Sequence, residues 1–418
     1  MDSDANPSGV RHLETLESPG HCALHAHCAT EAGTRSGGSR PNQDAFAVVE
    51  GVLSSQHVLA SLLDGHGPQG HFIARHVRDR LPAWVASCVE EERFENQSPP
   101  SPGWPASRLI PRGFASPPAW MQSSVGFLEL EAGGRLRRAA SAEGALPPGF
   151  PPACASLASA FLLLDTDLCT RRSALLDASR VTCDQSGCAA VTALVCREHV
   201  AVAACGDSSA FLAVQLPAAE RGSSAPAEAA ADGRCSPLRP RSPSQSGVDD
   251  APTCARPRYA ALPMSVAHKV QGSEAERLRL QGGRVAAHSG EGHIPRVWPR
   301  AEDAVPGRPS YGLAVSRSFG DLHWKGVGVC ASPDVVLRSI QPQDAFLLLC
   351  SDGVTDVMEG QRAVSIAADA LHGGGKGGSA ANAALAVNEE AKRLWASRFP
   401  RSQRDDITCI VLPLRKLS

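Results

Sequence analysis

Three short apolar runs in this chain each meet an aspartate at one end, and this pattern constrains the fold most. Two runs, 58–63 and 345–349, lead into an aspartate, and a third, 407–412, follows one. Buried strands end where the chain meets solvent, so a carboxylate there is held rigidly while its oxygens stay free to bind. Converging carboxylates repel one another unless a cation lies between them. The pattern therefore predicts a metal centre at the ends of sheet strands. Its aspartates are Asp64, Asp352 and Asp405.

The composition of the chain excludes several classes of function. The net charge of −2 over 418 residues gives no field that would attract nucleic acid. No apolar run reaches membrane-spanning length, and the sequence begins with neither a signal-like segment nor a glycine for myristoylation. The 14 cysteines include no Cys-x-x-Cys pair, so neither a zinc site nor a disulfide framework is indicated. We therefore expect a monomer of the cytoplasm or nucleus, without nucleic-acid or membrane partners.

Two stretches rich in proline, glycine and serine interrupt the periodic sequence. They lie near 92–152 and 218–258 and are interpreted as insertions or mobile loops. The strands that carry the aspartates lie on both sides of these stretches, so they do not separate two domains. We predict one discontinuous domain over residues 23–416, preceded by a disordered tail at 1–22.

The periodic segments predict both helices and strands. Residues 155–172 place apolar side chains at three- and four-residue steps, which predicts a long core helix. Two apolar runs, 189–195 and 199–205, are separated by a short polar turn and predict a β-hairpin.

Two further helices are predicted nearer the carboxyl terminus. A capping box over 273–276 opens a short helix that Gly282 and Gly283 close. Residues 379–399 have one apolar face and predict a longer helix. Helices that flank antiparallel strands indicate an α+β layered fold.

Eight motifs occur together and in order over about residues 35–412. Alone, a segment such as Asp64-Gly65-His66-Gly67 is weak evidence, because Asp-Gly is a common turn. The motifs cover residues 40–45 (RPNQDA), 63–67 (LDGHG), 186–190 (SGCAA), 205–208 (CGDS), 313–321 (LAVSRSFGD), 332–335 (SPDV), 350–357 (CSDGVTDV) and 404–408 (RDDIT). In this order they resemble the metal-dependent serine/threonine protein phosphatases of the protein phosphatase 2C type.

The resemblance implies two packed antiparallel β-sheets flanked by helices, a four-layer αββα sandwich with its metal site at one end. Two Mg²⁺ or Mn²⁺ ions would share Asp64, with the Gly65 carbonyl, Asp352 and Asp405 as the other direct ligands. Asp44 would support the ions through coordinated water. A water between the ions would supply the hydroxide that attacks phosphoserine or phosphothreonine of phosphoprotein substrates directly.

Four further residues receive roles from the same resemblance. His66 matches the histidine that protonates the leaving alkoxide, and its alternative role is that of a turn or capping residue. Asp184 and Asp356 match a weaker third metal site, and alternatively they are solvated turn carboxylates. Ser39 stands where relatives often carry the phosphate-binding arginine. Arg40 is therefore the candidate for this role, and Arg35 is its alternative.

Departures from the family pattern keep a second function open. Ser39, Ala204 and Ser209 favour a catalytically weak or inactive relative that binds phosphoproteins as a scaffold, and Gln43 stands where many relatives have glutamate. Because all the positions of the direct metal ligands are retained, we favour the enzyme.

Other matching residues are interpreted as architecture. Asp207 is expected to bond backbone amides in a turn, and Arg317 and Asp321 to form internal ion pairs or hydrogen bonds. His268 is placed outside the site.

Overall fold

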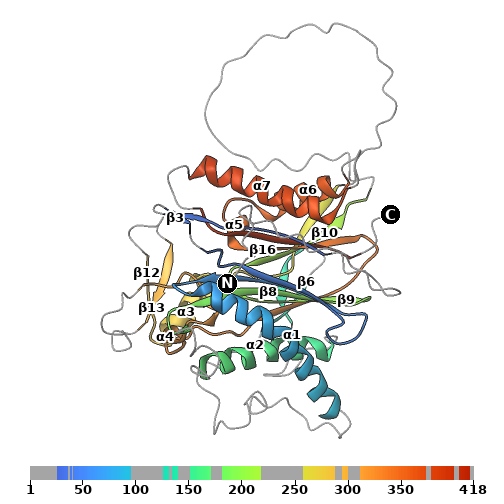
Figure 1. Ribbon diagram of the computed structural model, residues 1–418. Coiled ribbons are helices and arrows are strands. Elements are labelled where there is room, and N and C mark those ends of the chain that lie inside the picture. Colours follow the sequence, from blue (N-terminus) through green and yellow to red (C-terminus); the bar gives the residue numbers. More distant parts are fainter. Residues whose placement is uncertain are drawn as a thin grey trace, which may run out of the picture.

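Figure 1 shows the computed structural model, in which two stacked β-sheets lie between two pairs of helices. This αββα arrangement confirms the predicted α+β sandwich. The structure describes residues 26–35, 38–39, 41–95, 126–130, 134–139, 151–170, 181–217, 258–287, 294–299, 311–372, 378–399 and 404–414.

The larger sheet holds eight strands among the described residues. In spatial order they are β4 (Ala45–Glu50), β5 (Val58–His66), β8 (Gly187–Val195), β9 (His199–Cys205), β15 (Asp334–Ser339), β6 (Gly126–Leu130) and β7 (Leu136–Arg138), with β14 (Phe319–Gly320) beside β8.

The smaller sheet holds five strands in the part of the chain that the structure describes. In spatial order they are β1 (His27–Glu31), β17 (Ile407–Pro413), β16 (Asp344–Cys350), β10 (Ser209–Gln215) and β11 (Tyr259–Pro263). The strands β2 (Thr34–Arg35), β3 (Gly38–Ser39), β12 (Arg284–Ala287) and β13 (Pro295–Trp298) form two small ribbons outside the sheets.

Strand pairing is antiparallel throughout these two sheets except between β15 and β6, which run parallel. The predicted hairpin is confirmed as β8 and β9. Val195 and Val200 are the paired residues that flank its turn. The three apolar runs that meet aspartates are confirmed as β5, β16 and β17. β5 extends further than predicted, because Asp64 to His66 still pair with β8.

Helices cover the outer face of each sheet (Figure 1). Two helices, α1 (Gly70–Glu95) and α2 (Pro152–Thr170), lie on the larger sheet, and α6 (Gly360–Leu371) and α7 (Ala380–Arg398) lie on the smaller one. Ser379 caps α7 by accepting a hydrogen bond from the Asn382 N–H. The short helices are α3 (Gly272–Leu280), α4 (Leu322–Lys325) and α5 (Asp352–Thr355).

The apolar core forms three layers. Leu62, Val191, Leu212 and Leu347 lie fully buried between the two sheets. The two outer layers lie between each sheet and its helices, and their members include Ile73, Leu157 and Phe161 under the larger sheet and Leu348, Val364 and Val387 under the smaller one. Removing this much apolar surface from water is the main force that holds the layers together.

The predicted core helix is confirmed as α2. Leu157, Phe161, Leu164 and Leu168 form its buried face at the expected steps. Among the described helices, α2 alone is long and apolar enough to pass a membrane-span test, and 78% of its apolar window is buried inside the fold. Its apolar character is therefore used in the core.

The predicted capping box is wrong. α3 begins at Gly272 after Gln271, and no side chain caps its first turn. Glu274 instead accepts hydrogen bonds from the Arg277 and Arg317 side chains, so its carboxylate is bound to these guanidinium groups and caps no backbone N–H.

The breaker-rich stretch at 92–152 contains elements of the fold. α1 continues into it as far as Glu95, and β6 and β7 within it join the larger sheet. The tail at 1–22 and nearly all of the stretch at 218–258 lie outside the described residues.

Candidate metal centre

Strand register brings Asp44 beside Asp64. Ala45 pairs with Leu63 in the antiparallel β4–β5 ladder, so the residues one step further, Asp44 and Asp64, lie next to each other. The Gly65 N–H donates to the Gln43 carbonyl at 3.2 Å and continues this ladder past the end of β4. Two of the predicted carboxylates therefore come from one end of the larger sheet.

The smaller sheet brings Asp352 and Asp405 to the same end. Cys350 pairs with Cys409 where β16 ends and β17 has begun. Asp352 follows β16 as the first residue of α5, and Asp405 precedes β17. In an antiparallel pair, the end of one strand lies beside the start of the next, so both aspartates emerge together.

Electrostatics shows that the carboxylates from the two sheets meet. Burial raises the pKa of Asp64 well above its usual range, and the charges of Asp352, Asp44 and Asp405 raise it further. Burial likewise raises the pKa of Asp352, with the charges of Asp207 and Asp405 adding to it and a hydrogen bond with Asp64 lowering it. Asp64 and Asp352 are therefore in contact across the sandwich.

Asp44 has the features of a carboxylate that needs a cation. Its side chain is buried, and this burial, followed by the charge of Asp406, raises its pKa to about 8. Hydrogen bonds from the Thr408 and Ser351 side chains oppose this rise without cancelling it. Positive charge close to Asp44 would stabilise its ionised form further.

The donor set fits a hard divalent cation in its chemistry. The carboxylates and the Gly65 carbonyl offer oxygen atoms alone, which Mg²⁺ and Mn²⁺ prefer. Among the described residues, no three His, Cys, Asp or Glu side chains have the spacing of a finished ligand set.

Close backbone packing explains the glycine after Asp64. A Cβ at Gly65 would lie 2.5 Å from the Gln43 carbonyl oxygen and 2.6 Å from that of Gly70. No side chain fits there. The Gln43 side chain itself donates from Nε2 to the Gly67 carbonyl at 2.9 Å, so its amide holds the turn that follows His66.

His66 lies at the end of β5 and is bonded to Asp321. Its Nε2 lies 2.5 Å from Asp321 Oδ2, and a quarter of its side chain is exposed. Burial lowers the pKa of His66, but the charge of Asp321 and its hydrogen bond outweigh burial, so the pKa is raised. This contact does not match the alternative of a capping residue, and it confirms the internal bond expected of Asp321.

The two aspartates assigned to a third metal site lie in different settings. Asp356 is exposed, its charge raises the pKa of Asp352, and it forms an ion pair with Lys269 at 3.0 Å. Asp184 lies in the turn before β8, where its carbonyl accepts a hydrogen bond from the His323 N–H. Arg40 lies outside the described residues.

Sequence reasoning placed Asp207 outside the acidic site, and the structure brings it in. After burial, Asp207 is the first charge that raises the pKa of Asp352. Burial raises the pKa of Asp207 itself, and the Lys269 ammonium opposes this. The signal was present in the sequence, since Asp207 follows β9 just as Asp352 follows β16. Its position in a Gly-Asp-Ser turn concealed it.

Asp406 supports the site through the backbone. Its two oxygens accept hydrogen bonds from the Gly33 N–H at 2.5 Å and from the Gln43 N–H at 2.9 Å. It therefore joins the start of β17 to the segment that carries Asp44.

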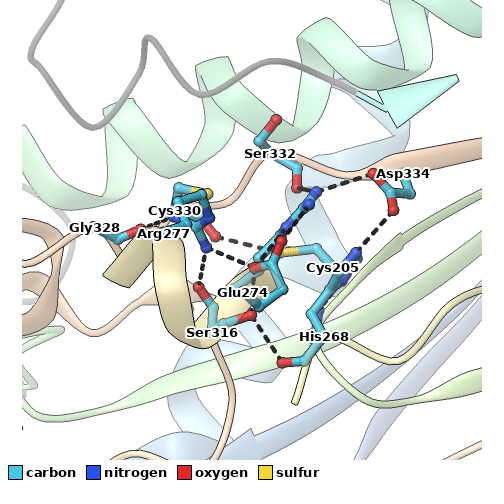
Figure 2. A network of polar contacts seen from close by, with 11 residues as sticks. Cys205, His268, Glu274, Arg277, Ser316, Gly328, Cys330, Ser332 and Asp334 are labelled. Carbon is cyan, nitrogen blue, oxygen red and sulfur yellow. Dashed lines mark hydrogen bonds and ion pairs between the residues drawn. The ribbon is translucent and has the colours of Figure 1, made fainter. Parts of the chain in front are cut away.

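A largely buried ionic network, part of which Figure 2 shows, contacts the Gly206–Asp207 turn through His268. Arg317 binds Glu274 at 2.8 Å and Asp334 at 3.1 Å, as expected for an internal ion pair. His268 lies 3.2 Å from Asp334 through Nε2 and accepts the Gly206 N–H at Nδ1. The network thus fixes the turn that carries Asp207, although His268 itself stays outside the acidic cluster.

Comparison with known proteins gives consistent results. The family model described as "Protein phosphatase 2C" matches residues 142–224 and 255–394, more than half of the chain. "Probable protein phosphatase 2C 14" of Oryza sativa subsp. japonica is 29% identical over 96% of this chain, and "Probable protein phosphatase 2C 61" of Arabidopsis thaliana is 28% identical over 91%. The alignments span 63% and 83% of those proteins.

The fold also matches a solved structure, described as "serine-threonine phosphatase 2C from Toxoplasma gondii". The match has a TM-score of 0.62 and 19% identity, and it covers 94% of this chain and 96% of the other. At this identity the match concerns the fold alone.

Proposed function

Since this chain belongs to the protein phosphatase 2C family, we propose that it hydrolyses phosphoserine or phosphothreonine esters of phosphoproteins with the help of divalent cations. One observation carries the proposal: Asp44, Asp64, Asp352 and Asp405 gather from two sheets at one end of the sandwich. So many partly buried carboxylates favour a site for cations.

The proposed ligand roles are those that the family resemblance implies, and the presence of these residues in the acidic cluster supports them. Asp64 would be shared by two Mg²⁺ or Mn²⁺ ions, with the Gly65 carbonyl, Asp352 and Asp405 as the other direct ligands. Asp44 would act through coordinated water. When bound, such ions lower the pKa of water, so that hydroxide is available near neutral pH.

His66 would supply the proton for the leaving group. A serine or threonine alkoxide is a poor leaving group, and protonation by a positioned side chain is worth about 10²–10⁴-fold in rate. The contact of His66 with Asp321 favours the protonated ring, as this task requires.

The remaining assignments stay part of the proposal. Arg40 would bind the phosphate, and Asp184 and Asp356 would form a weaker third cation site. A cation at Asp356 would have to compete with the Lys269 ammonium. All described cysteines are free thiols, which agrees with the proposed cytoplasmic or nuclear location.

Hydrolysis of a phosphothreonine peptide in the presence of Mn²⁺ tests the proposal. Asp64→Ala should lower the rate about 100-fold or more, because it removes a charged group at the reacting centre. Asp79→Asn is the matched control, since Asp79 is exposed on α1 and pairs with Arg78. It should leave the rate unchanged.

Equal rates for the wild type and Asp64→Ala would refute the proposed site. A wild type that binds the phosphopeptide without releasing phosphate would instead favour the alternative, a phosphoprotein-binding scaffold.

A further inference from the structure

Asp321 occupies an unusual place in the fold. Its side chain is fully buried, and among the described residues other than glycine it alone has a positive φ, 49°. This left-handed conformation is unfavourable for most side chains, though aspartate and asparagine tolerate it better than others. The surrounding structure must therefore hold Asp321 in place.

The contacts of Asp321 show what the conformation achieves. Oδ2 accepts a hydrogen bond from the Ser318 hydroxyl at 2.6 Å and lies 2.5 Å from His66 Nε2. The backbone N–H of Asp321 donates to the Ser186 carbonyl at 3.0 Å. Gly187 leaves the space for this carboxylate, because a Cβ there would overlap Oδ2. The carboxylate is thus fixed on both sides of the oxygen that meets His66.

A buried ion pair holds the segment that leads to Asp321. Asp165 on α2 and Lys325 on α4 lie 2.7 Å apart, and both side chains are almost completely buried. Lys325 Nζ donates to the Ser318 carbonyl at 2.8 Å, and Asp165 Oδ1 accepts the Gly320 N–H at 2.8 Å. The pair therefore clamps the backbone immediately before Asp321 to the core helix.

An ionised carboxylate can only accept hydrogen bonds, so the contact requires that His66 Nε2 carries the proton. The other ring nitrogen, Nδ1, is then the one free to meet a substrate. Part of the ring remains exposed, as that role needs.

We propose that Asp321 is a positioning residue that binds the Nε2–H of His66 and thereby presents Nδ1 to the leaving oxygen of the phosphate ester. This inference rests on the proposed function for its catalytic consequence, whereas the orientation of the ring can be measured without any activity.

The test compares two substrates that differ in their need for an acid. A phosphothreonine peptide has a poor leaving group and p-nitrophenyl phosphate a good one, so loss of the acid lowers the ratio of their rates. Asp321→Gly tolerates the positive φ and removes the carboxylate, and it should lower the peptide-to-nitrophenyl ratio about tenfold or more. Asp321→Asn keeps an acceptor oxygen and should restore most of that ratio.

Asp344→Asn is the matched control. Asp344 is also fully buried and ion-paired, with Arg338, but it lies at the opposite end of β16 from Asp352. It reports the effect of a lost buried charge away from the site, and the ratio should not change.

Two outcomes of these rate measurements would overturn the inference. An unchanged ratio in Asp321→Gly overturns it. An equal loss in Asp321→Asn and Asp321→Gly also does so, because the charge and not the bond would then matter.

Nitrogen-edited spectra of histidine-labelled protein, assigned with His66→Gln, provide the second measurement. We expect neutral His66 to carry its proton on Nε2 in the wild type. In Asp321→Gly, the preference for this tautomer over the Nδ1–H tautomer should weaken. A wild type protonated at Nδ1 overturns the inference. If the wild type hydrolyses neither substrate, the proposed function fails and the spectra alone decide the role of Asp321.

Discussion

Two residues fix the backbone around the acidic cluster at different electrostatic cost. Asp406 accepts hydrogen bonds from two backbone N–H groups, but its charge raises the pKa of Asp44. The Gln43 amide donates to the Gly67 carbonyl and adds no negative charge to a region that already holds at least four carboxylates. Gln43 is therefore suited to its place, although many relatives of the type that the sequence resembles carry glutamate there.

Gln43→Glu should separate the effect of the hydrogen bond to Gly67 on stability from the effect of negative charge on metal binding. The variant should lose about 1–3 kcal/mol of stability without metal, because a carboxylate would face the Gly67 carbonyl in place of a donor. It should also bind Mn²⁺ more tightly, since it adds a negative charge. Thermal unfolding and titration calorimetry measure the two quantities.

Gln43→Met is the control for this experiment, because it removes the donor without adding charge. It should lose stability while Mn²⁺ affinity stays as in the wild type. Tighter Mn²⁺ binding by Gln43→Met would show that charge is not the cause.

Among the residues of the site, the local pattern identified three aspartates at strand ends, passed over Asp207, and could not specify contacts between distant residues. Asp64, Asp352 and Asp405 were found because an apolar run beside an aspartate is visible locally. The bond between His66 and Asp321 joins residues 255 positions apart, and no local pattern specifies that pairing.

The elements of the site depend on a tight junction between α5 and β17. A Cβ on Gly353 would overlap the Asp406 carbonyl oxygen, and the Gly353 carbonyl accepts a hydrogen bond from Trp395 Nε1 on α7 at 2.7 Å. Asp352 and Asp405, one on each side of this junction, are therefore brought close by the absence of a side chain.

Gly353→Ala should push α5 away from the start of β17. We expect a loss of about 1–3 kcal/mol in stability from overpacking, together with weaker Mn²⁺ binding, because Asp352 and Asp405 would move apart. Denaturant unfolding and calorimetry measure these effects. If Gly353→Ala is destabilised but binds Mn²⁺ as tightly as the wild type, the junction does not determine the geometry of the metal centre.

Strong periodicity made the long elements predictable, and weak periodicity hid the short ones. α2, α7 and the β8–β9 hairpin follow from their apolar patterns. β6 and β7 are short strands within a stretch that is rich in proline and glycine, so the sequence around them resembles that of a loop. β6 enters the sheet by pairing with β15 and β7 by pairing with β6, and the β6–β15 contact is one that only the tertiary structure provides.

At the scale of the whole molecule, the two sheets bring carboxylates that repel each other close together at one end of the sandwich. The sandwich is held by the apolar layer between its sheets, while Asp44 and Asp64 from one sheet face Asp352 and Asp405 from the other. Core burial thus offsets electrostatic repulsion at the site, and the balance between them depends on pH and on cations.

The sign of the pH effect follows from the raised pKa values. Asp44, Asp64 and Asp352 have a higher pKa in the folded protein than in the unfolded chain, and that of Asp44 reaches about 8. The folded state therefore binds more protons between about pH 4 and pH 8, and this contribution to stability is lost as the pH rises through that window. Without metal, the melting temperature should contain a contribution that falls from pH 5 to pH 8.

Divalent cations should reverse this loss, because they replace the protons on the carboxylates. At a Mn²⁺ concentration about 100 times its dissociation constant, binding adds about 2.7 kcal/mol, which is about 3 °C in melting temperature for a chain of this size. The increment should be larger at pH 8 than at pH 5, where protons compete with Mn²⁺. Calorimetric melting of the wild type and Asp64→Ala with Mn²⁺ and with a chelator measures it. An increment that is the same in Asp64→Ala and the wild type would mean that Mn²⁺ binds elsewhere.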